Sequence, residues 1–92
     1  MNFSKAPSGS TNMSSLVGYW DGPYSKLVQV LGKPHYTDGD KTRAEWHLRF
    51  EDGTIATVYD YREYCGAERV TEWHIGGFRE KALDRVLEIL EA

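Results

Sequence analysis

Cysteine is almost absent from this chain, since Cys65 is the one cysteine among 92 residues. A disulfide within the chain is therefore excluded, and we expect a reducing compartment. No apolar run approaches the roughly 20 residues of a membrane-spanning helix. The N-terminus also lacks the apolar segment of a secretory signal peptide. These absences predict a cytoplasmic protein that makes no contact with a membrane.

A surplus of positive charge is also missing, because 11 Lys and Arg residues stand against 14 Asp and Glu residues and give a net charge of −3. Proteins that bind nucleic acid without sequence preference usually carry a basic stripe, and the composition shows none. What the chain does have is 40% hydrophobic and 13% aromatic residues, with three Trp and six Tyr. That content is enough for the core of one small domain.

The N-terminal segment, residues 1–15, is polar and rich in serine, which is typical of a flexible arm. Residues 16–92 are then expected to form a single domain. Within that domain, residues 16–20 read as either a short edge strand or an extended lead-in. The first clear element follows this segment.

Residues 21–31 predict a helix. The segment opens with Asp-Gly-Pro, and proline suits the first turn of a helix because its missing N–H group has no partner there. Apolar side chains then recur at the i, i+3, i+4 and i+7 spacing of one helical face. Gly32 and Pro34 follow as a stop signal.

The strongest signal is the alternation of apolar and polar residues over 43–51, which predicts a half-buried strand with Trp46 and Phe50 inward. Asp52-Gly53 predicts a two-residue type I′ turn, and the chain returns as a strand over 55–61. This loop length predicts the core-facing pairs Phe50–Ile55, Leu48–Thr57, Trp46–Tyr59 and Ala44–Tyr61. The outward pairs are Arg49–Ala56, His47–Val58, Glu45–Asp60 and Arg43–Arg62, of which the last two oppose like charges and are unfavourable.

A third strand over residues 70–75 and a last helix over 78–91 complete the predicted elements. The expected fold is α+β: a three-stranded antiparallel β-meander with two helices packed on one face and a flexible N-terminal arm. The other face of the sheet would then be open to solvent.

The tripeptide Glu-Trp-His occurs twice, at residues 45–47 and 72–74. Strand alternation turns each Trp inward and each His toward the open face. His47 and His74 would lie about 10 Å apart across the middle strand, with Val58 between them. Because zinc holds its ligands at about 2.0–2.1 Å, we predict no metal site. The alternative is a small metal-assisted enzyme that uses both histidines.

The expected open face also carries arginine side chains, whose planar guanidinium groups bind carboxylates and phosphates through paired hydrogen bonds. The charged and polar side chains of this face form either an ordinary solvated surface or a recognition surface. The candidate binding residues are Arg43, His47, Arg49, Arg62 and His74 on the sheet and Trp20 beside it. Of the neighbours Tyr19 and Trp20, we expect one in the core and the other partly exposed.

No pattern in the sequence indicates catalysis. Cys65 has none of the protease-type signatures around it, and a lone loop cysteine is usually inert. Gly76-Gly77 lacks the spacing of a phosphate-binding loop and indicates a strand-to-helix turn. We therefore predict no catalytic residue, no metal and no cofactor.

Several motifs between residues 18 and 77 resemble a family of small proteins common in bacteriophage genomes. They are Tyr24–Val28 with Leu31–Pro34, Asp38–Thr42, Ala44–Trp46, Phe50–Asp60 and Trp73–Gly77. The resemblance implies a phage accessory protein, and the size and composition also resemble anti-CRISPR proteins. It assigns no role to any residue, and the N-terminal arm lies outside it.

The leading functional hypothesis is an inhibitor that binds a multi-subunit, RNA-guided CRISPR-Cas surveillance complex in the host cell. It would block recognition of target DNA without catalysing a reaction. Its partner would be a host protein or ribonucleoprotein, with arginine contacts to protein carboxylates or guide-RNA phosphates. The alternatives are a sponge that sequesters a nucleotide immune signal, the metal-assisted enzyme, and a small lipoprotein-like scaffold module.

Overall fold

The computed structural model describes residues 2–6, 14–36, 44–60 and 71–91. Its elements, in chain order, are β1 (Phe3–Lys5), β2 (Ser15–Asp21), α1 (Tyr24–Leu31), β3 (His35–Tyr36), β4 (Ala44–Phe50), β5 (Ile55–Tyr59), β6 (Glu72–Gly77) and α2 (Lys81–Leu90).

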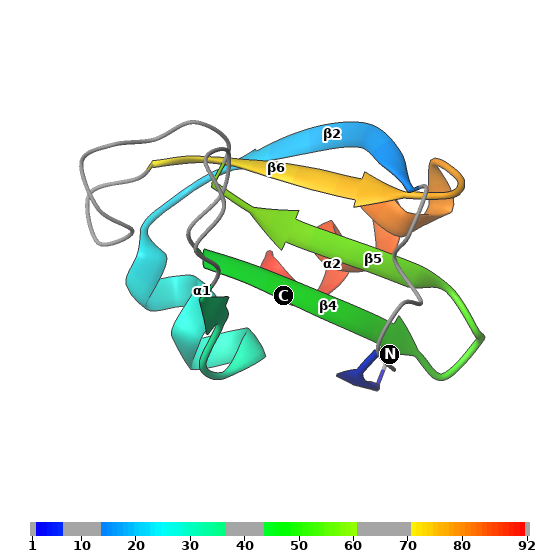
Figure 1. Cartoon of the computed structure of the whole chain (residues 1–92), viewed down its shortest axis with the longest axis horizontal. Helices are drawn as coiled ribbons and strands as arrows, with labels where there is room; N and C mark the ends of the chain where they lie inside the picture. The colour runs from blue at the N-terminus through cyan, green and yellow to red at the C-terminus, as the bar shows by residue number, and fades with distance from the viewer. Residues whose placement is uncertain (1, 7–13, 37–43, 61–70, 92) are drawn as a thin grey trace.

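The strands form one antiparallel sheet in the order β1-β4-β5-β6-β2, and β3 pairs with the same edge of β4 as β1 but at the opposite end of that strand (Figure 1). The fold is α+β, but the predicted three-stranded meander is wrong. β4, β5 and β6 are only the centre of a larger sheet, whose other strands come from distant parts of the chain. Short strands that pair with distant parts of the chain leave little signal in their own sequence, because the contacts that stabilise them come from the strands beside them.

The predicted flexible arm is wrong for Phe3–Lys5, which pair as β1 with the end of β4. The Phe3 ring lies 6.0 Å from the Phe50 ring, and Ala6 N donates to His47 O at 2.9 Å. An aromatic side chain that reaches the core therefore orders a segment whose polar composition favours flexibility. Residues 7–13 lie outside the described part of the chain.

The hairpin between β4 and β5 forms, but its predicted register is wrong by one residue. Phe50 N donates to Thr54 O at 2.8 Å, and Gly53 N donates to Phe50 O at 2.9 Å. The loop therefore has three residues, 51–53, and Gly53 adopts a left-handed conformation with φ of 89°. This is the three-residue hairpin with a bulge glycine, in place of the expected two-residue turn.

The extra loop residue exchanges the two faces of β5. Trp46 is opposite Val58 and Leu48 is opposite Ala56, so the two β5 side chains face the helices and are buried. Tyr59 lies opposite Glu45 on the other face. The expected pairs Trp46–Tyr59 and His47–Val58 are therefore absent, because a one-residue shift turns every side chain of a strand to the opposite face.

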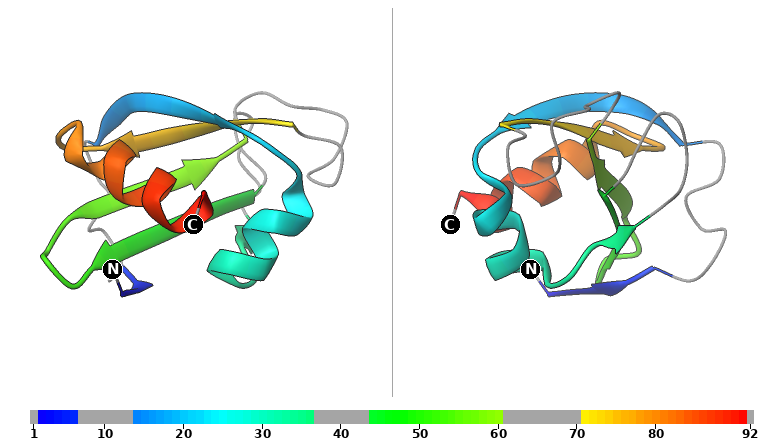
Figure 2. Two further views of the ribbon diagram at one scale, coloured as in Figure 1. Left: turned by 180° about the vertical axis from the view of Figure 1, so that it is seen from behind. Right: turned by 60° about the vertical axis from the view of Figure 1, so that its left-hand side comes forward.

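Both helices pack on one face of the sheet, as the right-hand view of Figure 2 shows. α2 packs against β6, β2 and β5, and α1 lies beside α2. The apolar stripe of α2 buries Ala82, Val86 and Leu90. The helix lies so close to the sheet that a Cβ atom on Gly77 would come within 2.4 Å of the Ala82 Cβ atom.

The two Glu-Trp-His tripeptides place their tryptophans in the core beneath α1. Trp46 Nε1 donates to Gly32 O at 2.9 Å, and Trp73 Nε1 donates to Gly22 O at 3.2 Å. The two indoles meet edge to face with ring centroids 5.6 Å apart, and Tyr24 of α1 packs against both. Buried indole N–H groups need acceptors, and carbonyl groups beyond the helix ends supply them.

Candidate functional site

The sheet face opposite the helices carries a line of cross-strand partners. Tyr19 of β2 pairs with His74 of β6, His74 pairs with Tyr59 of β5, and Tyr59 pairs with Glu45 of β4. We call these four residues the open-face row. Because directly opposed residues share a face, the four side chains cross the sheet in one line.

Three rings of the open-face row are in contact. His74 stacks on Tyr59 with centroids 5.5 Å apart and an interplanar angle of 19°, and Tyr19 meets His74 edge-on at 5.0 Å. Tyr19 is 53% exposed, while His74 and Tyr59 are half-buried. Cross-strand aromatic pairs are worth about 0.2–1 kcal/mol each. The rings are therefore held in place, with one edge of the group open to solvent.

Gly76 makes room for this arrangement on β6. A Cβ atom at Gly76 would come within 2.7 Å of Thr57 Oγ1 and 3.5 Å of a Tyr59 ring carbon. The missing side chain therefore lets the β5 side chains lean across β6. The predicted strand-to-helix turn at Gly76-Gly77 is wrong, because both residues lie within β6.

A second row of the open face runs beside the first. His47 pairs with Thr57, which pairs with Gly76. His47 Nε2 lies 2.9 Å from Glu45 Oε2, and both side chains are partly exposed. The histidine and the glutamate are two residues apart on one strand and so point to the same face. Their contact links the second row to the open-face row.

Arg49 continues the open face toward the end of β4. It pairs with Ile55 on one side and with Ser4 of β1 on the other, and it is exposed. An open pocket of about 300 Å³ lies beside it, lined by Arg49, Ser4 and the neighbouring residues Asn2, Phe3, Phe50 and Glu51. β1 thus contributes a wall to the surface that carries the arginine.

Of the six predicted binding residues, the structure brings His47, Arg49 and His74 to the open face. Trp20 does not belong to that surface, because it is 7% exposed and lies in the core with Trp73 opposite it. The expectation that one of Tyr19 and Trp20 is buried and the other exposed is confirmed. Arg43 and Arg62 lie outside the described residues.

The predicted like-charge pair of Glu45 and Asp60 is absent. Asp60 is 1% exposed and faces the helices, where its Oδ1 atom accepts a hydrogen bond from Ala44 N at 2.9 Å. Val58 also faces the helices and does not separate His47 from His74. Both corrections follow from the three-residue loop, which moves the even-numbered residues of β5, and Asp60 directly after it, to the core side.

The sequence interpretation missed Tyr59 and Tyr19 as members of the open face. Tyr59 was assigned to the core through the wrong register, and Tyr19 carried no assignment to a face. A usable signal was present in Asp52, Gly53 and Thr54, because Asp followed by Gly also suits a loop with a left-handed glycine at its last position.

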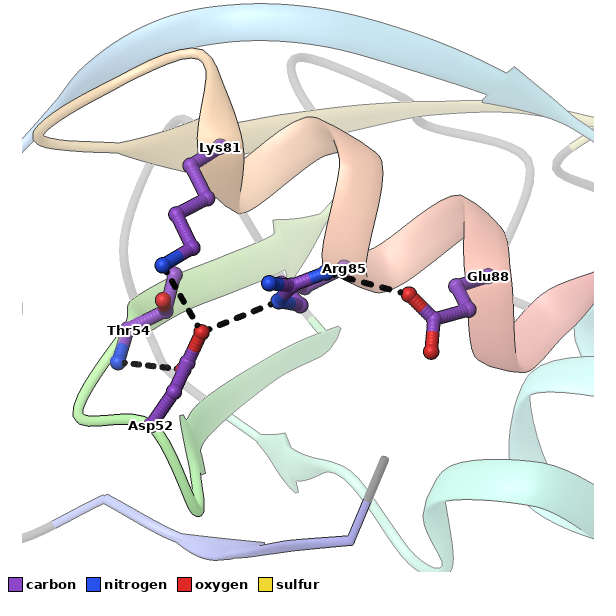
Figure 3. A network of polar contacts seen from close by, with 5 residues as sticks. All are labelled: Asp52, Thr54, Lys81, Arg85 and Glu88. Atoms are coloured by element: carbon purple, nitrogen blue, oxygen red, sulfur yellow. Dashed lines mark hydrogen bonds and ion pairs between the residues drawn. The ribbon is translucent and has the colours of Figure 1, made fainter.

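A polar network ties the hairpin turn to α2, as Figure 3 shows. Asp52 accepts hydrogen bonds from Thr54 N, Lys81 Nζ and Arg85 Nε, each at 3.0 Å. Arg85 Nη1 also donates to Glu88 Oε2 at 3.2 Å. The hydrogen bonds from Thr54, followed by those from Lys81 and Arg85, hold the pKa of Asp52 well below its ordinary value.

Asp52 in turn raises the pKa of the Arg85 guanidinium. The network joins a loop to a helix through several hydrogen bonds and ion pairs, on the helix side of the sheet. It therefore acts as a structural clamp on the hairpin register.

Within the described ranges, no group of three His, Cys, Asp or Glu side chains is placed to hold a metal ion. None of the helices in the same ranges has the length and apolar character needed to cross a membrane. Comparison of the chain with protein-family models, with curated proteins and with solved structures found no match in any of the three.

Proposed function

We propose that this protein acts by binding, and that its open face covers a surface of a multi-subunit CRISPR-Cas surveillance complex and blocks recognition of target DNA without catalysis. The observation that supports binding is the open-face row, a half-exposed group of Tyr and His rings held by contacts with one another. Tyrosine is enriched among residues that dominate binding energy, and rings on strands lose little freedom on association.

The polar groups around the row suit an acidic partner surface. Arg49 is exposed on β4, four residues along the strand from Glu45 of the row. His47 lies between those two residues on β4, and His74 belongs to the row itself. A guanidinium group pairs with a carboxylate or a phosphate through two parallel hydrogen bonds. Protein carboxylates and guide-RNA phosphates both present such acceptors, and a surveillance complex contains both.

The choice of a CRISPR-Cas complex rests on the motifs in residues 18–77 that resemble small bacteriophage proteins. A phage inhibitor of this kind would work in the cytoplasm of the host cell. It needs no cofactor, because covering a surface involves no bond making or breaking.

The test is co-purification with a panel of multi-subunit effector complexes, followed by target-DNA binding in the presence of the protein. Tyr19→Ala and His74→Ala should weaken inhibition at least about tenfold, which corresponds to about 1.4 kcal/mol of binding energy. Phe78→Ala is the matched control, since Phe78 is 54% exposed but lies outside the open face. Absence of a complex with every effector, or equal inhibition by all three variants, contradicts the proposal.

A second candidate, a sponge for a nucleotide immune signal, is favoured by the contact between the three rings. Aromatic side chains stack on nucleobases at about 1–3 kcal/mol per base, and Arg49 could pair with a phosphate. Calorimetry with cyclic dinucleotides, cyclic trinucleotides and ADP-ribose derivatives measures whether the protein binds such a ligand. Flat titrations across that panel remove this candidate.

A further inference from the structure

The two edges of the described sheet differ in how their backbone groups are paired. The outer edge of β4 pairs with β3 at Ala44 and Glu45 and with β1 at Leu48 to Phe50. β2 is the terminal strand at the other side and pairs with β6 alone among the described strands. A terminal strand presents backbone N–H and C=O groups to any strand that can pair with it.

Apart from Asp21 at its end, β2 lacks the charged side chains that commonly protect such an edge. Residues 15–20 carry no charge, in a protein where 27% of residues are charged. Of the three large hydrophobic side chains exposed in the described residues, two are on this strand, Leu16 at 46% and Tyr19 at 53%. The edge is therefore neutral and partly apolar.

A bulge in β2 brings those two side chains to the same face. Leu16 lies opposite Gly76 and Tyr19 lies opposite His74, with the irregularity between Leu16 and Gly18. Three residues of β2 thus span the length of two residues of β6. Leu16 and Tyr19 consequently share the open face, although an odd spacing in a regular strand would separate them.

The backbone alternation of the strand directs both residues outward. Gly22 N donates to Thr71 O at 2.8 Å, which marks that pair as a hydrogen-bonded one. Pairs alternate along an antiparallel ladder, so the pairs of Tyr19 with His74 and of Leu16 with Gly76 are of the other kind. The backbone groups of Tyr19 and Leu16 therefore point away from β6.

We infer that two copies of this chain associate through β2, antiparallel about a two-fold axis, with Leu16 of each copy opposite Tyr19 of the other. In this register the outward N–H and C=O groups of Leu16 in one copy face those of Tyr19 in the other copy, where they form hydrogen bonds between the two strands. On the open face each exposed leucine packs against an exposed tyrosine, which is a favourable aromatic–aliphatic pair. The sheet continues through the dimer, and two open faces join into one.

Charge and size set the strength of this association. In the same register the one charged residue of β2, Asp21, lies opposite Ser14, so no like charges meet. A single strand pair covers less area than the roughly 1,600 Å² of a standard stable interface. We therefore expect a dissociation constant in the micromolar range, with a monomer in dilute solution. The inference is independent of the proposed function, because it involves no other protein.

Sedimentation equilibrium over about 1 µM to 1 mM tests the association. The wild-type chain should pass from monomer to dimer, and Leu16→Lys and Tyr19→Lys should each weaken the dimer at least about tenfold. Phe78→Lys is the control, because it charges an equally exposed hydrophobic residue elsewhere. A monomer at every concentration overturns the inference and leaves the edge to a strand of another protein. A dimer that only Phe78→Lys disrupts also overturns it.

Cysteine cross-linking tests the register itself. In a Cys65→Ser background, Leu16→Cys and Tyr19→Cys chains are mixed and oxidised. Directly opposed Cα atoms at a hydrogen-bonded pair are about 5.5 Å apart, within the range of a disulfide, while two copies of residue 16 lie too far apart. The mixture should cross-link into heterodimers at least about ten times faster than either variant alone. Equal rates for the mixture and the single variants overturn the register.

Discussion

Trp46 and Trp73 donate their indole N–H groups to carbonyls at opposite ends of the same helix, α1, while their rings pack edge to face beneath it. The two residues are the centres of the repeated Glu-Trp-His tripeptide. The repeat therefore has a structural explanation in its tryptophans, and its histidines are placed on the opposite face of the sheet by strand alternation.

Replacing either indole by phenylalanine should destabilise the fold. Trp46→Phe and Trp73→Phe each lose a hydrogen bond and leave a partly buried carbonyl without its donor, at a cost of about 1–3 kcal/mol. Urea denaturation measures the change in the free energy of unfolding. In the double variant the losses should not add, because the two rings touch. Unchanged stability in both single variants contradicts the role of these bonds in fixing α1.

Adding one methyl group at Gly77 should force α2 away from the sheet. The new Cβ atom would lie 2.4 Å from the Ala82 Cβ atom, and overpacking of a core typically costs about 1–3 kcal/mol. Thermal denaturation of Gly77→Ala should show a lower Tm. The double variant Gly77→Ala/Ala82→Gly relieves the collision, so it should recover part of the loss beyond what the helix propensity of glycine removes. Full stability of Gly77→Ala would contradict the close packing.

The clamp at Asp52 predicts a defined pH dependence. Since hydrogen bonds lower the pKa of this carboxyl group in the folded protein, it stabilises the fold at every pH above its unfolded-state value of about 3.9. That contribution is lost as the pH falls through the lower folded-state pKa. Asp52→Asn should therefore have a lower Tm than the wild-type protein at pH 5–8, and the gap should narrow below about pH 4.

Glu88→Gln is the control for that experiment, because Glu88 contacts Arg85 and not Asp52. Its Tm should change less than that of Asp52→Asn at neutral pH. A gap between Asp52→Asn and wild type that stays constant down to pH 2 contradicts the ion-paired clamp.

The N-terminal strand should protect backbone amides and contribute to stability. Ala6 N donates to His47 O and Glu51 N donates to Asn2 O, so both amides should exchange slowly with deuterated solvent. Phe3→Ala should speed their exchange and cost about 1–2 kcal/mol, because it removes a partly buried ring from Phe50. Ser4→Ala, which changes an exposed side chain, is the control. Rapid exchange of both amides in the wild-type chain contradicts the pairing of β1.

The sequence by itself determined the two helices, the three central strands and the inward face of β4. Apolar side chains at every second position from Ala44 to Phe50 are buried whichever strand lies beside them, because the pattern belongs to that strand alone. The same alternation sent His47 and Arg49 to the face opposite the helices, and the alternation in β6 sent His74 there. Local periodicity and turn residues are enough for such features, since each depends on a few neighbouring residues.

Only the tertiary structure decided what depends on distant partners. The loop hydrogen bonds of Phe50, Gly53 and Thr54 moved the β5 register by one residue, which brought Tyr59 to the open face and Asp60 to the core. Pairing across the chain also recruited β1, whose short segment has no pattern of its own. It also decided between the two readings of residues 16–20, which form the edge strand β2 and not an extended lead-in. A strand of three residues gains its stability from the sheet that it joins, so the sequence of that short segment alone does not predict the strand.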